Sequence, residues 1–186
     1  MTKNLIGILV VSLCLAGNPV AAAESLEVVI QRANQGDADA QYLVGATLFS
    51  GKYGDLKDQA QAQAATWFRA AAEQGHAKAQ LALGNMYFNG FGIPQNYVEA
   101  AKWYSKAAEQ GDELAQFGVG LIYRDGLGVP KDKALAYMWF NISSVKDRTR
   151  EKAGTARDEI AKYMTRDQIA EAERMTREWM AVHLSQ

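Results

Sequence analysis

The sequence has few cysteines and histidines, the residues that most often form disulfides, bind metal ions or act in catalysis. It contains one cysteine and two histidines among 186 residues. A single thiol cannot close an internal disulfide, and a structural zinc site takes four Cys or His ligands. No Gly-x-Ser-x-Gly, His-Glu-x-x-His or phosphate-loop pattern occurs. We therefore predict no catalytic residues, no metal and no cofactor.

The chain also lacks an excess of charge of either sign. Its 20 basic residues nearly balance its 21 acidic residues, for a formal net charge of −1. In the one stretch that looks basic, residues 146–177, acidic residues interleave with the basic ones, as on a solvated helical face. A broad basic surface for phosphate backbones is therefore excluded, and we predict no nucleic-acid partner.

Only one long apolar run is present, and it lies at the N-terminus. A short start that contains Lys3 precedes an apolar stretch from Leu5 to Ala16, and small residues follow at Ala21–Ala23. This layout is typical of a secretory signal peptide, which here includes Cys14. The alternative, a membrane anchor, needs about 20 apolar residues. We expect cleavage after Ala23, a periplasmic or secreted protein, and no stable membrane insertion once the signal is removed.

Proline is scarce too, and two of the three prolines belong to an internal repeat. Pro94 and Pro130 lie 36 residues apart, as do seven further pairs of identical residues. The pairs are Ala79/Ala115, Gly84/Gly120, Tyr87/Tyr123, Gly90/Gly126, Gly92/Gly128, Ala100/Ala136 and Trp103/Trp139. A fixed period of this length indicates a solenoid or another repeat array.

A third, earlier copy extends the array. Gly45 lies 39 residues before Gly84, whereas Trp67 lies 36 residues before Trp103. The difference of three residues predicts an insertion, which we place in a loop from Lys52 to Asp58. Loops tolerate such insertions because lengthening them costs little entropy.

Each copy predicts two helices joined by a glycine-rich turn. In the second copy the apolar residues recur at helical spacing on both sides of Asn89–Pro94. Asp37, His76 and Asp112 hold equivalent places at which a helix N-cap is expected. Glycine inside a helix costs about 1 kcal/mol relative to alanine. We therefore interpret Gly84 and Gly120 as points where two helices approach closely.

The two ends of the array are predicted to be caps. Residues 24–36 match only the second helix of a unit, with Val28 at the tryptophan position. After Val145 the pattern predicts one helix from about Asp147 to Met164 and another that opens with a Thr165/Gln168 capping box. The predicted organisation is signal 1–23, capping helix 24–36, repeats 37–75, 76–111 and 112–147, and C-terminal capping helices 148–186.

These motifs resemble the Sel-one-like repeat (SLR) family of the tetratricopeptide superfamily. The most specific phrases run from Ala79 to Pro94 and from Glu99 to Gly111, and the resemblance covers about residues 36–145 strongly. It implies an all-α, right-handed α-solenoid. It also implies adaptor, scaffold or immunity functions rather than a common reaction. A cysteine-rich subgroup is linked to β-lactams, but it pairs cysteines within each repeat, and this chain has none there.

In such solenoids the first helix of each unit lines the concave side. Nine positions on the outward face of those helices, at spacings i, i+4 and i+7, form a predicted partner-binding ladder. They are Tyr42, Ala46 and Phe49, then Leu81, Asn85 and Phe88, then Phe117, Leu121 and Arg124. The alternative, strongest for positions 42, 81 and 117, is that these side chains only pack helix against helix.

The sequence leaves two classes of function open. The favoured class is a protein-binding module that grips a peptide, a helix or a secreted effector in its concave groove, either as a periplasmic scaffold or as an immunity protein that neutralises a toxic effector such as a phospholipase. The less favoured class is a hydrolase of cell-wall or β-lactam substrates, for which the sequence supplies no nucleophile–base pair.

Overall fold

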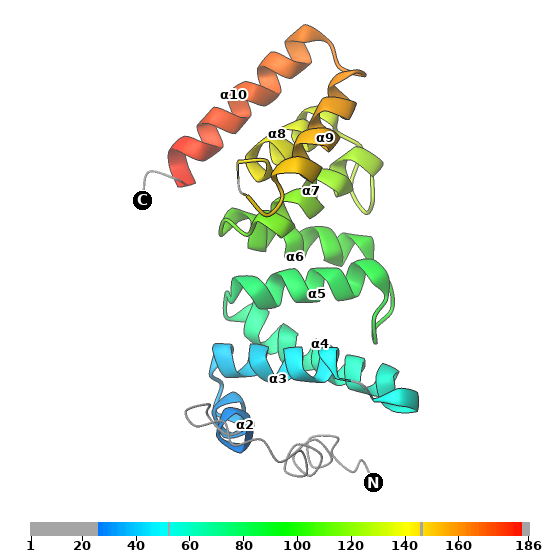
Figure 1. Cartoon of the computed structure of the whole chain (residues 1–186), viewed down its shortest axis with the longest axis vertical. Coiled ribbons are helices and arrows are strands. Elements are labelled where there is room, and N and C mark those ends of the chain that lie inside the picture. Colours follow the sequence, from blue (N-terminus) through cyan, green and yellow to red (C-terminus); the bar gives the residue numbers. More distant parts are fainter. Residues whose placement is uncertain (1–25, 52, 146, 184–186) are drawn as a thin grey trace.

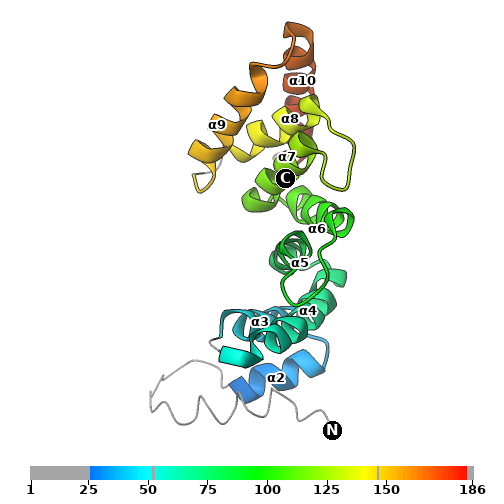
Figure 2. The ribbon, with the colours of Figure 1, turned by 90° about the vertical axis from the view of Figure 1, so that its right-hand side faces the viewer.

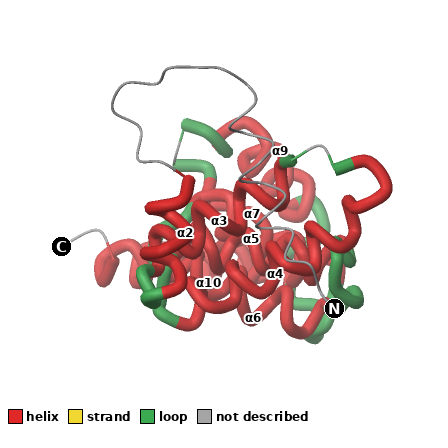
Figure 3. The backbone as a smooth tube through the Cα atoms, turned by 90° about the horizontal axis from the view of Figure 1, so that it is seen from below, coloured by secondary structure: helices red, strands yellow, loops and turns green. Residues whose placement is uncertain are grey.

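The computed structural model describes residues 26–51, 53–145 and 147–183; the predicted signal peptide lies outside them. The described residues form helices and loops without a strand (Figure 3). In chain order the elements are α2 (Leu26–Asn34), α3 (Ala38–Ser50), a 3-10 turn η1 (Gly54–Leu56), α4 (Lys57–Glu73), α5 (Ala77–Asn89), α6 (Tyr97–Glu109), α7 (Glu113–Asp125), α8 (Lys133–Ser143), α9 (Arg150–Ala161) and α10 (Arg166–His183).

Helices α2 to α8 stack in sequence order along the long axis of the molecule, and α10 runs back alongside α8 (Figure 1). Pairs α3/α4, α5/α6 and α7/α8 are the three predicted repeat units, and each packs on the next. In the perpendicular view α9 lies on the same side of the stack as α3 and α5 (Figure 2). The predicted all-α solenoid of helix–turn–helix units is confirmed.

The first helix of each unit starts at the predicted cap. Asp37 Oδ1 accepts the Ala40 N–H at 2.9 Å, and Asp112 Oδ1 accepts the Ala115 N–H at 2.9 Å. In the middle unit, the ring nitrogen His76 Nδ1 accepts the Ala79 N–H at 3.1 Å. These bonds satisfy backbone donors that would otherwise lack partners at the helix start. All three predicted N-caps are confirmed, including His76.

The glycines inside the first helices mark close helix contacts, as predicted. A Cβ built on Gly84 would lie 2.7 Å from Tyr104 Cδ1, and one on Gly120 would lie 2.5 Å from Phe140 Cδ1. Gly45 has the same relation to Phe68, at 2.8 Å. A Cβ less than 3.0 Å from a ring atom would force the ring or the helix to shift. The aromatic ring of each second helix therefore packs directly on the glycine backbone.

The tryptophans contribute unequally to the core. Trp103 and Trp139 are buried, with 5 % and 7 % of their surface exposed, but Trp67 is only half-buried. The next residue is the deeper one in the first and third units, since Phe68 is 3 % exposed and Phe140 is fully buried, whereas Tyr104 is 5 % exposed like Trp103. The predicted core role of tryptophan holds for the second and third units and only partly for the first.

Helix α2 keeps the predicted alignment: Gln41 donates to the Ala33 carbonyl as Gln80 does to the Ala72 carbonyl, so Val28 holds the tryptophan position and Val29 the place of Phe68. Val28 is nevertheless 42 % exposed, and α2 buries Val29 and Ala33. One local prediction was wrong: the three-residue insertion is not confined to a loop. Lys57 and Asp58 lie in α4, which is 17 residues long against 13 for α6, so the insertion partly lengthens a helix.

The C-terminal helices close the stack. Helix α9 buries Ala153, Ala156 and Ile160, and it runs from Arg150 to Ala161, which is shorter at both ends than the predicted Asp147–Met164. Helix α10 begins with the predicted capping box: Gln168 N–H donates to Thr165 Oγ1 at 3.2 Å and Thr165 N–H donates to Gln168 Oε1 at 2.9 Å. α10 then packs on α8.

Candidate binding groove

A cavity of about 300 Å³ lies between the first helices of the first two units. Four of the nine predicted ladder residues line it together: Tyr42, Ala46, Phe49 and Asn85. The remaining lining residues are Ser50, Phe68, Ala82 and Met86. The structure thus brings α3 and α5 together around one largely apolar hollow, with polar groups at Ser50 and Asn85.

Aromatic side chains build the wall that α3 contributes. Tyr42 stacks on His76 with ring centroids 4.7 Å apart. The ring centroid of Phe49 lies 6.4 Å from that of Phe68 and 5.8 Å from that of Phe91. Aromatic pairs at these separations hold each other in place. The wall is therefore rigid, and Tyr42 and Phe49 each have a packing role in addition to their place in the cavity.

Asn85 supplies a fixed polar group at the edge of the cavity. The Tyr104 hydroxyl, whose pKa burial raises well above its ordinary value, donates to Asn85 Oδ1 at 2.7 Å. This bond directs the amide nitrogen away from Tyr104, and Asn85 Nδ2 has no hydrogen-bond partner among the described residues. Since Asn85 is exposed, this nitrogen is a free donor for the main-chain carbonyl of a bound segment.

Two other ladder residues, Leu81 and Phe88, belong to the packing between the second and third units. Both pack against the core cluster that includes Tyr104 and Val119. Phe88 also meets Tyr97 edge-on, with centroids 5.3 Å apart. Leu81 therefore packs helix against helix, as the alternative interpretation of the ladder expected. Phe88 has the same packing role.

The ladder residues of the third unit lie beside α9. Phe117 shares a cavity with Ala156 and Thr155 of α9, and Leu121 packs against the core cluster that contains Ile160. Here the face that is open in the first unit is occupied by the chain's own helix. Of the nine predicted positions, four thus line the open cavity, four lie in packing contacts between helices, and Arg124 is exposed.

Arg124 is held by its neighbour in sequence. Its Nε and Nη2 donate to the two carboxylate oxygens of Asp125 at 2.8 and 2.7 Å. This pair raises the pKa of Arg124, and it lowers the pKa of Asp125 below the ordinary value of 3.8. Since the pair is half-exposed, we assign it little stabilising energy.

Sequence reasoning missed Ser50 and Ala82 as lining residues. Ser50 lies one position beyond Phe49, and Ala82 one beyond Leu81. A strict i, i+4, i+7 ladder follows one line along a helix, whereas a cavity between two helices also takes the neighbouring positions. A prediction that included the positions next to each ladder residue would have found both Ser50 and Ala82.

The described residues hold no cluster of three or more His, Cys, Asp or Glu side chains that could bind a metal ion. Among the helices of the same part of the chain, none combines the length and the hydropathy needed to cross a bilayer.

Comparison with known proteins identifies the family. The Sel1 repeat profile matches residues 38–76, 77–112 and 114–144, more than half of the chain. The chain belongs to the Sel1 repeat family. Proteins with these repeats generally mediate protein–protein interaction, and the fold is typically a non-catalytic scaffold. No curated protein matches the sequence.

Two solved structures show the same architecture. One is a protective antigen of uropathogenic Escherichia coli strains that displays an SLR fold. It is 30 % identical with a TM-score of 0.63, and the match covers 95 % of this Sel1 repeat chain and 44 % of the antigen. The other is a Sel1 repeat protein from Oxalobacter formigenes, 33 % identical with a TM-score of 0.60, covering 69 % of this chain and 98 % of that one. The chain therefore spans less than half the length of the first of these proteins.

Proposed function

We propose that this Sel1 repeat protein is a binding module that holds a short segment of a protein partner in the cavity between α3 and α5. The cavity carries this proposal because it combines apolar walls with a fixed donor, Asn85 Nδ2, to which no described residue bonds. Apolar walls accept side chains, and a directed N–H donor binds a main-chain carbonyl. Rigid walls limit the entropy that binding must overcome.

The third unit supports this assignment by contrast. There the equivalent face is lined by Ala156 and Ile160 of α9, so the fold itself places a helix on the ladder positions. In the first two units no described helix occupies that place. A helical or extended segment of a partner can occupy the open cavity in the same way as α9 occupies its own.

A matched pair of arginine substitutions tests the proposal. Ala46→Arg places a long cation inside the 300 Å³ cavity, whereas Ala170→Arg places the same side chain on an exposed position of α10. Parent and variants are used to capture partners from an envelope extract of the source cells, with circular dichroism as the control for helicity. We expect Ala46→Arg to reduce capture at least about tenfold, as for the loss of a binding hot spot, and Ala170→Arg to leave it unchanged.

Equal capture by the folded Ala46→Arg variant would contradict the proposal. Loss of capture by both variants would locate the contact elsewhere on the surface.

We further propose that the chain works outside the cytoplasm as a scaffold, after cleavage behind Ala23. The support is the signal-like N-terminus, which lies outside the described residues. Mass spectrometry of the protein from a periplasmic or secreted fraction should find Glu24 as the first residue. A chain that retains Met1 in the cytoplasm would refute export.

A further inference from the structure

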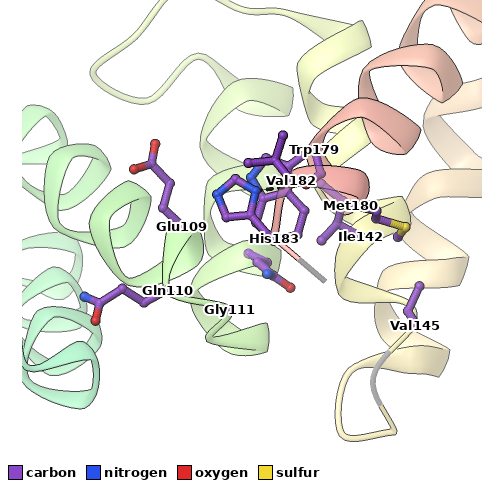
Figure 4. A pocket seen from close by; sticks show the side chains of 10 residues that line it. Glu109, Gln110, Gly111, Ile142, Val145, Trp179, Met180, Val182 and His183 are labelled. Atoms are coloured by element: carbon purple, nitrogen blue, oxygen red, sulfur yellow. Dashed lines mark hydrogen bonds between the residues drawn. The ribbon is translucent and has the colours of Figure 1, made fainter. Parts of the chain in front are cut away.

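A second and larger cavity, of about 440 Å³, lies at the other end of the repeats. The end of α6, the end of α8 and the last turns of α10 enclose it (Figure 4). The residues of its lining that bear on its chemistry are Gln116, Ile142, Trp179, Met180, Val182 and His183. This volume is in the range of small-molecule sites, and polar and apolar residues share the walls.

One polar atom at this cavity is unsatisfied. Gln116 is 1 % exposed and donates from Nε2 to the Ala108 carbonyl at 3.2 Å, but its Oε1 has no hydrogen-bond partner among the described residues. Gln63 Oε1 is the other such oxygen, but Gln63 is only half-buried. A buried acceptor without a donor costs free energy, so an unpaired Gln116 Oε1 indicates a missing partner.

The repeats show which partner fits. Gln41 and Gln80 hold the equivalent position and donate to the Ala33 and Ala72 carbonyls as Gln116 does to Ala108. Their Oε1 atoms are satisfied, since Gln74 Nε2 donates to Gln41 at 2.8 Å and Gln110 Nε2 donates to Gln80 at 2.7 Å. In both units the donor is therefore the primary amide of a glutamine.

The third unit lacks this glutamine. The residue that follows Gln110 by 36 positions is Lys146, which lies outside the described residues. Around the acceptor, α10 instead supplies an aromatic and apolar wall, in which Trp179 and His183 stack with centroids 4.1 Å apart and His183 Nδ1 lies 2.9 Å from the Trp179 carbonyl. Glu109 and His183 are the titratable groups of the lining.

We propose that this cavity binds a ligand with a primary carboxamide on an apolar stem. The amide N–H donates to Gln116 Oε1, as the glutamine amides do in the first two units, and the stem packs against Ile142, Trp179 and Met180. A carboxylate would place acceptor against acceptor and a negative charge near Glu109. The site is separate from the groove between α3 and α5, so it stands independently of the proposed function.

Three probes of one shape test the site: 4-phenylbutanamide, 4-phenylbutanoate and 4-phenylbutylamine. Binding is followed by NMR through the Met180 methyl and the Trp179 indole N–H. We expect saturable shifts with the amide and at least about tenfold weaker binding of the acid, because a buried acceptor is then left unpaired. Equal binding of the acid, tighter binding of the amine, or no shift with the amide would overturn the proposal.

Variants assign the binding to Gln116. Gln116→Met should weaken amide binding at least about tenfold, whereas Gln41→Met loses the equivalent bond, to the Ala33 carbonyl in the first unit, and should bind as the parent does. If Gln116→Met does not fold, Val182→Trp fills the cavity from an exposed position and should abolish binding. Amide binding that survives in folded Gln116→Met, or in Val182→Trp, would overturn the proposal.

One further variant tests the chain's own lysine. Lys146→Ala should bind the amide as the parent does. Binding that appears only in Lys146→Ala would show that Lys146 already occupies the acceptor, and would overturn the proposal.

Discussion

At the scale of single residues, the contact between a glycine of the first helix and an aromatic ring of the second sets the distance between the two helices of each unit. Gly84→Ala should lower the free energy of unfolding by up to about 2 kcal/mol, because the overpacking cost of about 1–3 kcal/mol outweighs the gain of about 1 kcal/mol in helix propensity. The Tyr104 ring cannot turn away easily, since its hydroxyl is bonded to Asn85 at 2.7 Å.

The matched control is Gly154→Ala. A Cβ on Gly154 in α9 would meet no heavy atom within 4 Å, so this change should raise stability by up to about 1 kcal/mol. Chemical denaturation of both variants measures the difference. A Gly84→Ala variant as stable as Gly154→Ala would contradict the close contact.

The two tryptophans of the first two units should differ in the same assay. Trp103→Ala removes a side chain that is 5 % exposed and should cost about 3–5 kcal/mol. Trp67→Ala should cost clearly less, because Trp67 is only half-buried. Equal losses for the two variants would show that the first unit packs its tryptophan as deeply as the second.

At the scale of elements, the start of α3 should depend on pH. The Ala40 N–H and Arg32 lower the pKa of Asp37 below its ordinary 3.8. A carboxylate with a lowered folded-state pKa contributes its full stability above the unfolded value, and that contribution is lost as the pH falls through the folded value. We therefore expect Asp37 to contribute at neutral pH and to lose its contribution at pH values below about 3.8.

Asp37→Asn tests this account, because asparagine caps a helix without titrating. Thermal melts of parent and variant should differ above pH 4 and converge in acid. A difference that stays constant down to pH 2 would contradict the assignment.

The sequence predicted the elements well because each has a local cause. Asp112 and the Thr165/Gln168 box mark helix starts through side chains that bond nearby backbone groups. The 36-residue period then places equivalent helices without further information. The alignment of α2 also held, but the exposure of Val28 was not foreseen, because α2 is an end helix that packs in the stack mainly against α3.

The candidate site was less predictable because it depends on contacts between distant segments. Helical spacing indicates which face of α7 is free of its own unit, but it does not reveal that α9, some 30 residues later, lies there. For the same reason the cavity at Gln116 was not foreseen, since α10 encloses it from the far end of the chain.

At the scale of the whole molecule, the three units are similar in construction but differ in what covers them. The first two leave an open cavity that contains Ala46 and Asn85, and the last is covered by α9 and α10. In a solenoid each unit contacts only its neighbours, so terminal helices are needed to protect the open end of the core. The open cavity is then the surface on which a partner can add to the stack.

Site-specific photocrosslinking in the source cells tests that claim most directly. Ser50 lines the cavity and Thr66 lies on α4 outside it. Both are exposed, and both donate their hydroxyl to the carbonyl four residues earlier. A photoreactive residue at position 50 should give one defined protein adduct, which Ala46→Arg removes, and the same residue at position 66 should not. An identical adduct from both positions, or an adduct at position 50 that persists in Ala46→Arg, would contradict binding in the cavity.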